Sequence, residues 1–362
     1  MQAAVENKRN RSIDFFRFLF AIIVCLLHNR DYEVFGEKPT AFYGGYLAVE
    51  FFFILAGFLE MAHFEKIPAL QANITDEKER WKAFRAYVAN RVYALFPMYL
   101  FAMLLTGSIR IIIQKWRFKE MIVKGFYELF MLQTIGLGDF YINDLLWYVS
   151  ALFCGSVIVA YFIIFHRQLF LNYLAPITII IILAAQYRLF GHYPWPMVWG
   201  VLRAICEICI GCLAYQLYKV LSRRLRRSFI VATVMEVGLL LLLLYVMWGS
   251  RSDYMDFVIL PFITAFILAL ALGWGGLSKV LDSKVSDYLG GISYAIYTCQ
   301  HVFIILFREG MIPSPENYWV QAAEFVAMTI VLAMITTPLC KRGTDMLLKK
   351  VKEKCIIPTS NG

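Results

Sequence analysis

The sequence predicts an all-α membrane protein, a polytopic bundle of about ten transmembrane helices. Sixty per cent of the 362 residues are hydrophobic and 17% are charged, whereas soluble domains carry about 25% charged residues. Apolar runs of about 20 residues, the length that crosses a bilayer core, recur along the whole chain. We therefore expect one membrane domain over residues 12–340, between an N-terminal segment (1–11) and a basic tail (341–362).

The predicted spanning helices follow the apolar runs in order. They are residues 12–30, 43–61, 87–106, 145–165, 169–189, 197–218, 228–248, 257–274, 288–307 and 318–340. The segment 121–137 is also apolar, but it is short and contains Lys124 and Glu128. We expect this segment to be a re-entrant or interfacial piece on the outer side of the membrane.

Lysine and arginine residues gather in four places, which are the N-terminus, residues 62–86, residues 219–227 and the tail from 341. Short cytoplasmic loops are rich in these residues. Ten spans place all four regions on one side, whereas an eleventh span at 121–137 would separate them. Both termini are therefore predicted to be cytoplasmic, in a cell (inner) membrane protein. The net charge of +9 is explained by these loops and does not indicate a nucleic-acid partner.

One outer loop is an exception to this distribution. The ten-span arrangement leaves four basic residues outside, namely Arg110, Lys115, Arg117 and Lys119. The eight cysteines do not indicate a disulfide framework, since seven lie in apolar segments. Three of them form "CEICIGC" (206–212), whose spacing resembles a metal motif. We interpret this segment as a strip of small residues for close helix packing, and we expect no metal.

The first apolar run carries ionisable residues near both ends. Arg17 and His28 are eleven residues apart, which brings them to nearly the same side of a helix, and Asp14 lies about 60° from Arg17. Charged groups are costly in hydrocarbon, so this polar face should look into protein. The structural alternatives are an Asp14–Arg17 pair that neutralises itself at the helix mouth and a hydrogen-bonded packing role for His28.

The second and third predicted helices also carry charge. Glu50 shares a helical stripe with Tyr46 and Gly57, which gives the carboxylate an inward face beside a close-packing glycine. Arg85 and Arg91 open the third helix from the cytoplasmic side. Arginines at this position suit phosphate binding. The alternative for Glu50 is a structural ion pair with an arginine.

Aromatic and polar side chains recur in two later segments. Trp147 lies one helical turn from Asp144 in "NDLLWYVSALF" (143–153). Tyr294, Tyr297 and His301, spaced i, i+3 and i+7, share one face of "GGISYAIYTCQH" (290–301). The two tyrosines also suit a role as interfacial anchors.

These residues together suit group transfer from a phosphorylated carrier. A neutral imidazole takes a proton from an attacking hydroxyl, a carboxylate steadies the imidazolium, and arginines hold phosphates. No P-loop, zinc motif or GxSxG nucleophile motif is present in the sequence.

The same residues resemble the acyltransferase 3 family of bacterial membrane-bound O-acyltransferases. Five segments carry the resemblance in order, from about residue 10 to about residue 340: "IDFFRFLFAIIVCLLHN", "GGYLAVEFFFILAGFL", "NRVYALFPMYL", "LLWYVSALF" and "GGISYAIYTCQH". The chain departs from the family pattern at two positions. Ala56 stands where the family usually has Ser, and Ala94 stands where a second arginine is common, which leaves Arg85 or Lys82 to supply that charge.

The resemblance implies an acyltransferase that moves an acyl group, usually acetyl, from acetyl-CoA to a hydroxyl of a cell-surface polysaccharide or related glycan. Its partners would be acyl-CoA, a glycan or glycolipid acceptor and the lipid bilayer. His28 would be the base or a transient acyl carrier, and Glu50 would orient it. The other roles carried over are donor binding by Arg17, Arg85 and Arg91, and an acceptor side lined by Trp147, Tyr294 and His301. An extended pantetheine arm bridges the roughly 16 Å between Arg17 and His28 on one helix.

Two other classes of function fit a polytopic membrane protein. A transporter or flippase for a polar or glycolipid substrate also places polar groups at mid-membrane. The sequence shows no pair of related halves with Gly- or Pro-broken helices, which favours the enzyme over the transporter. A sensor or scaffold without catalysis is the third class, and turnover of labelled acetyl-CoA separates the enzyme from both.

Overall fold

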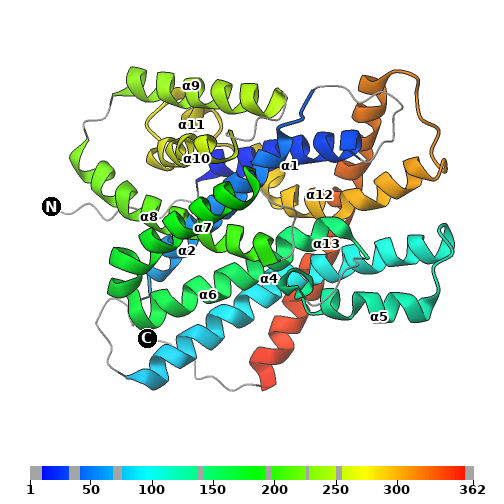
Figure 1. Cartoon of the computed structure of the whole chain (residues 1–362), viewed down its shortest axis with the longest axis horizontal. Coiled ribbons are helices and arrows are strands. Elements are labelled where there is room, and N and C mark those ends of the chain that lie inside the picture. Colours follow the sequence, from blue (N-terminus) through cyan, green and yellow to red (C-terminus); the bar gives the residue numbers. More distant parts are fainter. Residues whose placement is uncertain are drawn as a thin grey trace.

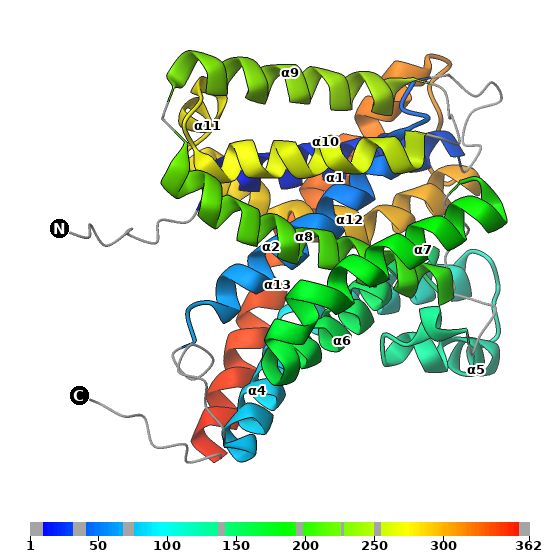
Figure 2. The ribbon, with the colours of Figure 1, turned by 60° about the vertical axis from the view of Figure 1, so that its left-hand side comes forward.

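The computed structural model describes residues 10–31, 41–67, 76–136, 142–192, 198–225, 228–249 and 255–354, and within these ranges the chain is helical without strands. The helices pack side by side as one bundle (Figures 1 and 2). The long helices are α1 (Arg11–Asp31), α2 (Ala48–Phe64), α4 (Glu77–Ile112), α6 (Trp147–Leu169), α7 (Ala175–Phe190), α8 (Val198–Arg224), α9 (Phe229–Trp248), α10 (Met255–Leu272), α12 (Lys284–Arg308) and α13 (Tyr318–Lys354). The short elements are η1 (Gly45–Leu47), α5 (Phe118–Leu129), η2 (Gln133–Ile135), η3 (Asp144–Leu146), η4 (Phe170–Leu174) and α11 (Gly276–Val280).

The polytopic helical bundle predicted from the sequence is confirmed. Within the described ranges, nine helical stretches are long and apolar enough to cross a membrane, and one of them, Asp144–Phe190, is 47 residues long. His166 has non-helical backbone angles inside this stretch, and the π-turn η4 follows it. Figures 1 and 2 show α6 and α7 leaving this break in different directions. Each of the ten predicted spans therefore corresponds to a helix of the bundle.

The described part of the predicted segment, residues 121–136, does not form a spanning helix. Its helix α5 has 12 residues, which gives a length of about 18 Å against a hydrocarbon core of about 30 Å. After α5 the chain turns through Met131, whose φ is positive, into the short helix η2. Figure 2 shows α5 at the edge of the bundle.

Two helices extend further than the hydrophobic runs predict. Helix α4 begins at Glu77, ten residues before the predicted start at 87, because the Asp76 side chain accepts a hydrogen bond from the Lys78 amide and caps the helix. Helix α13 continues to Lys354, well into the predicted tail (341–362). The added turns are polar, so hydropathy locates the membrane-crossing part of each helix but not its end.

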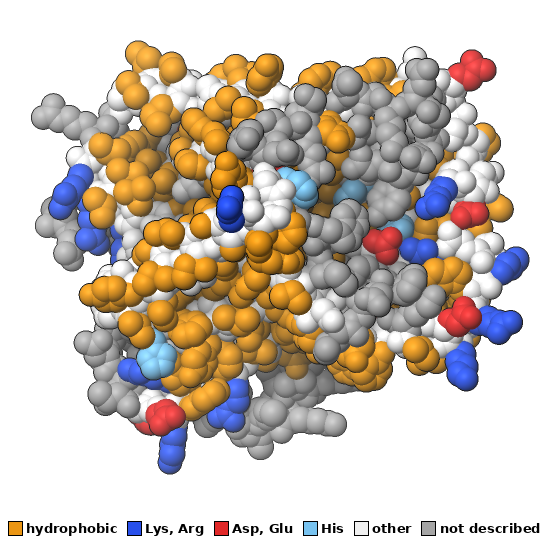
Figure 3. All heavy atoms as spheres, viewed as in Figure 1, with side chains coloured by type: hydrophobic (Ala, Val, Ile, Leu, Met, Phe, Trp, Pro, Cys, Tyr) orange, Lys and Arg blue, Asp and Glu red, His pale blue; other side chains and the backbone are white. Residues whose placement is uncertain are grey.

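Charge is distributed unevenly over the molecule. On the face shown in Figure 3, apolar side chains cover the middle and most charged side chains lie toward two opposite edges. Helix α9 contributes exposed apolar residues along its length, and only 11% of its most apolar stretch is buried. An apolar surface of this kind suits contact with lipid.

Glycine residues allow the central helices to approach closely. A Cβ atom at Gly57 of α2 would collide with the Ile208 backbone of α8, and one at Gly211 of α8 would collide with the Ile54 carbonyl of α2. Gly211 belongs to the segment 206–212, where close helix packing was expected. A Cβ atom at Gly290 of α12 would likewise collide with Asp14 of α1.

The side of the membrane on which each loop lies is testable by cysteine labelling. Lys115 precedes α5 and Ser314 lies between α12 and α13, and both are exposed. Because α5 does not span, Lys115→Cys and Ser314→Cys should react with an impermeant maleimide from the same, outer side. Lys284→Cys should react only from the cytoplasmic side, and the wild type is the blank for native thiols. Labelling of the first two positions from opposite sides would restore 121–137 as a span.

Candidate functional site

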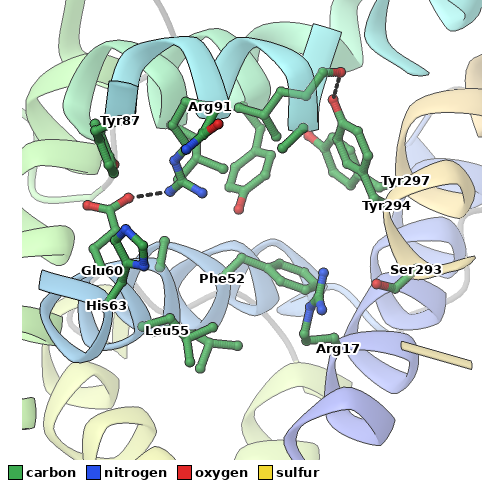
Figure 4. Close-up of a pocket in the computed structure, with 17 residues that line it drawn as sticks. Arg17, Phe52, Leu55, Glu60, His63, Tyr87, Arg91, Ser293, Tyr294 and Tyr297 are labelled. Atoms are coloured by element: carbon green, nitrogen blue, oxygen red, sulfur yellow. Dashed lines mark hydrogen bonds and ion pairs between the residues drawn. The ribbon is translucent and has the colours of Figure 1, made fainter. Parts of the chain in front are cut away.

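A cavity of about 470 Å³ lies among α1, α2, α4, α6 and α12 (Figure 4). It is lined mostly by apolar and aromatic side chains, with a few charged ones. The charged and polar lining residues are Arg17, Glu60, His63, Tyr87, Asn90, Arg91, Tyr148, Ser293, Tyr294 and Tyr297. A volume between about 300 and 1,000 Å³ is typical of small-molecule sites. His63 and Asn90 are exposed at its rim.

Arg17 lies at one end of this cavity, beyond Phe52 as seen from Glu60 (Figure 4). Its Nη1 atom is 3.1 Å from Oδ1 of Asp14, which is buried. The sequence offered this pair, from the i, i+3 spacing, as the structural alternative for Arg17. The close packing at Gly290 holds this turn of α1 against α12.

A second polar cluster, which we call the Glu60 cluster, consists of Glu60, Arg91, Ser156 and Tyr87. Oε1 of Glu60 accepts hydrogen bonds from Nη2 of Arg91 and from the Ser156 hydroxyl, the latter at 2.6 Å. Arg91 Nη2 also donates to Ser156 at 3.0 Å. Glu60 is 4% exposed and Tyr87 is 7% exposed. The cluster therefore places an ion pair in a nearly dry wall of the cavity.

Three atoms of the Glu60 cluster are buried without a hydrogen-bond partner in the described part of the chain. They are Oε2 of Glu60, the hydroxyl of Tyr87 and Nε of Arg91. The Tyr87 hydroxyl lies close to the side chains of Glu60, Ser156 and Arg91 and interacts with them weakly, but none of these contacts is a well-aligned hydrogen bond. Buried polar atoms are normally paired, so unpaired atoms in a cavity wall point to a ligand.

His28 does not line the cavity but is connected through Gln300 to the wall formed by Tyr297, which we call the inner wall. Its Nδ1 atom is 3.2 Å from Oε1 of Gln300, and Nε2 of Gln300 donates to the Tyr297 carbonyl at 2.9 Å. The Tyr297 side chain lines the cavity and donates its hydroxyl to the Leu145 carbonyl. One helical turn of α12 therefore connects the cavity wall to the His28 ring.

His301 belongs to a neighbouring network at the same end of α12. Its Nδ1 atom is 3.0 Å from Oδ1 of Asn143, and its Nε2 atom is 3.5 Å from Arg110. Asn143 is fixed in turn by its backbone amide, which donates to Oε1 of Glu128 at 2.9 Å. Burial raises the pKa of the Glu128 carboxyl to about 8, although hydrogen bonds from the Ile142 and Asn143 amides oppose this shift.

The structure pairs Glu50 with an arginine of another helix. Glu50 is fully buried and forms an ion pair with Arg203 of α8, whose Nε donates to Oε2 of Glu50 at 3.0 Å. Within the described residues no hydrogen bond or ion pair joins Glu50 to His28, and Gln300 holds the position at the ring that was predicted for Glu50. The physical reason is that α8 places a buried arginine opposite Glu50, so the alternative of a structural ion pair describes this residue.

The other predicted site residues divide among different places. Tyr294 lines the cavity and donates its hydroxyl to the Leu95 carbonyl at 2.9 Å. Trp147 packs against Phe53 and under Arg203, so it adjoins the Glu50 pair. Arg85 is exposed on a different face of α4, where it lines a separate surface hollow with Lys78 and Trp81. The structure therefore unites Arg17, Arg91 and Tyr294, and it leaves Arg85 apart.

Sequence reasoning missed Glu60, Gln300 and Arg203. Glu60 and Arg203 each carried a signal, because each is a charged residue in a predicted span or at its edge, and such residues are costly in the membrane. Gln300 stands directly before His301 in the segment 290–301, but it is uncharged and lies off the face shared by Tyr294, Tyr297 and His301.

Comparison with known proteins identifies the class of domain. A family model described as an acyltransferase domain matches residues 10–338, nearly the whole chain. No curated protein and no solved structure matches the chain.

Proposed function

Since the chain belongs to the acyltransferase 3 family of membrane acyltransferases, we propose that it transfers an acetyl group from acetyl-CoA to a hydroxyl of a cell-surface polysaccharide or related glycan. The observation that supports this proposal is the cavity between Arg17 and Arg91, whose inner wall at Tyr297 is one helical turn from the partner of His28. The cavity would take the thioester arm of the donor. The acceptor would approach His28 from the other end of α1.

In the proposed reaction His28 acts as the base. The basic nitrogen of its ring takes the proton of the acceptor hydroxyl, and the hydroxyl oxygen attacks the thioester carbon. The C–S bond then breaks, and the coenzyme A thiolate leaves with the bond's electron pair. The imidazolium returns its proton to that thiolate, so the products are an O-acetyl ester and a free thiol.

Gln300 determines which nitrogen of His28 is basic. Because Nε2 of Gln300 donates to the Tyr297 carbonyl, its Oε1 is the atom that faces His28 and can only accept a hydrogen bond. His28 Nδ1 therefore carries the hydrogen in the neutral ring. Nε2 of His28 is left as the nitrogen that takes the proton.

Replacing Gln300 tests this assignment. Gln300→Leu removes the acceptor and should lower kcat about 10- to 100-fold, as happens when the partner that orients a functional histidine is lost. The KM for acetyl-CoA should change little, because Gln300 does not line the cavity. Gln300→Glu keeps an acceptor and should recover much of the rate. Equal loss in both variants, with an unchanged melting temperature, would contradict the positioning role.

The class of function is tested directly with purified protein and labelled acetyl-CoA. We expect thiol release that depends on the protein and increases when a hydroxyl-bearing glycan fraction is added. Label should appear in the glycan as an alkali-labile ester. Uptake of a glycolipid by vesicles without any thiol release would instead indicate a transporter or flippase.

A further inference from the structure

The Glu60 cluster carries an inference about which part of the donor binds there. An arginine in a cavity wall suggests phosphate binding, and Arg91 was predicted to have that role. The structure pairs Arg91 with Glu60 inside the wall, so the charge of the guanidinium is already neutralised. A phosphate placed against Arg91 would also meet the carboxylate of Glu60, and like charges repel in a poorly solvated site.

The unpaired atoms of the Glu60 cluster suit an uncharged ligand better than a phosphate. Oε2 of Glu60 is an acceptor, whereas the Tyr87 hydroxyl and Nε of Arg91 are donors. A ligand that pairs both kinds of atom needs a donor and an acceptor close together and no net charge. A secondary amide has this pattern, with one N–H and one C=O group.

We propose that the Glu60 cluster binds an amide group of the donor's pantetheine arm, with the N–H donating to Glu60 and the C=O accepting from Tyr87 or Arg91. This inference rests on the proposed function, because it assigns part of the same cavity to the thioester donor. The apolar lining at Phe52 and Leu55 then accommodates the rest of the uncharged arm. The phosphates of the donor remain at the rim beside His63, which is exposed and lies within electrostatic range of the exposed Lys66.

The proposal also explains why an ion pair is retained in the cavity wall. Buried ion pairs are costly and need further hydrogen bonds to satisfy their remaining atoms. Ser156 supplies one such bond, at 2.6 Å. An uncharged polar group that enters the cavity would satisfy the remaining unpaired atoms.

The test uses the full-length protein in detergent and two probes, each of which represents one part of the donor molecule. Pantetheine carries the amides without phosphates, and adenosine 3′,5′-bisphosphate carries phosphates without the arm. Binding of each is measured by calorimetry, so the result does not depend on turnover. Tyr87→Phe keeps the ring that packs on Phe64 with centroids 5.0 Å apart. It should weaken pantetheine binding about 2- to 12-fold, as expected for one hydrogen bond, and leave bisphosphate binding unchanged.

Glu60→Gln provides a second test, in which binding of the two probes should change in opposite directions. This variant removes the negative charge beside Arg91, so it should weaken pantetheine binding and strengthen bisphosphate binding. Tyr93→Phe is the control, because Tyr93 lies on the same helix but does not line the cavity. Weaker bisphosphate binding in Tyr87→Phe or Glu60→Gln, with unchanged pantetheine binding, would overturn the amide assignment. Normal pantetheine binding without thiol release from acetyl-CoA would instead refute the proposed function.

Discussion

Replacing His28 with alanine should abolish nearly all acyl transfer, lowering the rate about 10²- to 10⁴-fold, which is the usual contribution of a general base. Donor affinity should stay near that of the wild type, because His28 does not line the cavity that we assign to the donor. The imidazole is half-buried and shares a hydrogen bond with Gln300. Because the ring is only partly buried, the melting temperature should change little. Single-turnover transfer with labelled acetyl-CoA measures the rate, and calorimetry measures binding.

Asn29→Ala is a suitable control for the His28 variant. Asn29 is buried on the same turn of α1 and pairs with Gln321 at 3.4 Å, so its loss perturbs the helix without touching the imidazole. This variant should keep its activity. If His28→Ala stays active, the base is a different group, and His301 is the next candidate.

The rate of acyl transfer should also fall at low pH. Protonation of the imidazole removes the base, so activity should fall once the pH is low enough to protonate His28. A rate that does not fall when the His28 ring is protonated, measured where chemistry limits the rate, would contradict the assignment of His28.

Replacing Glu50 with alanine should have the largest effect on stability. Arg203 would remain buried with an uncompensated share of its charge, and breaking a buried ion pair typically costs about 3–5 kcal/mol. Oε1 of Glu207 lies 3.5 Å from Nε of Arg203 and still partly neutralises the guanidinium in the variant. We therefore expect a loss of unfolding free energy near the lower end of this range. Thermal unfolding in detergent measures the change.

A combined replacement of all three charged residues distinguishes the structural role of Glu50 from a catalytic one. Glu50→Leu and Arg203→Leu together with Glu207→Gln remove the buried charges on both sides of the arginine and should recover most of the stability, because uncharged side chains often substitute well for a buried ion pair. If Glu50 instead acted through His28, Glu50→Ala would lose activity without losing stability. That outcome would restore the role that the sequence predicted.

Hydropathy and charge in the sequence were enough to determine the class of fold. The ten apolar runs all became helices, and the described part of 121–137, which contains Lys124 and Glu128, forms the short helix α5 and no helix long enough to span. These predictions succeed because a chain in hydrocarbon must satisfy its backbone hydrogen bonds within each segment, which leaves the helix as the available structure. Helix ends were less predictable, since α4 and α13 continue as polar helix outside the apolar runs.

Spacing within one helix also indicated a local pair, which was the structural alternative for these two residues. Asp14 and Arg17, three residues apart, form an ion pair. Such contacts depend only on helical geometry, which the sequence specifies.

Partners on different helices were decided by the tertiary structure. The sequence placed Glu50 with His28, but α8 brings Arg203 to Glu50 and α12 brings Gln300 to His28. It also assigned Arg91 to phosphate, whereas α2 supplies Glu60 as its neutralising partner. Each of these contacts joins residues that are 31 to 272 positions apart. Hydropathy shows that a side chain faces inward, but the rotation and close approach of the neighbouring helices, such as the glycine contacts between α2 and α8, determine which group it meets.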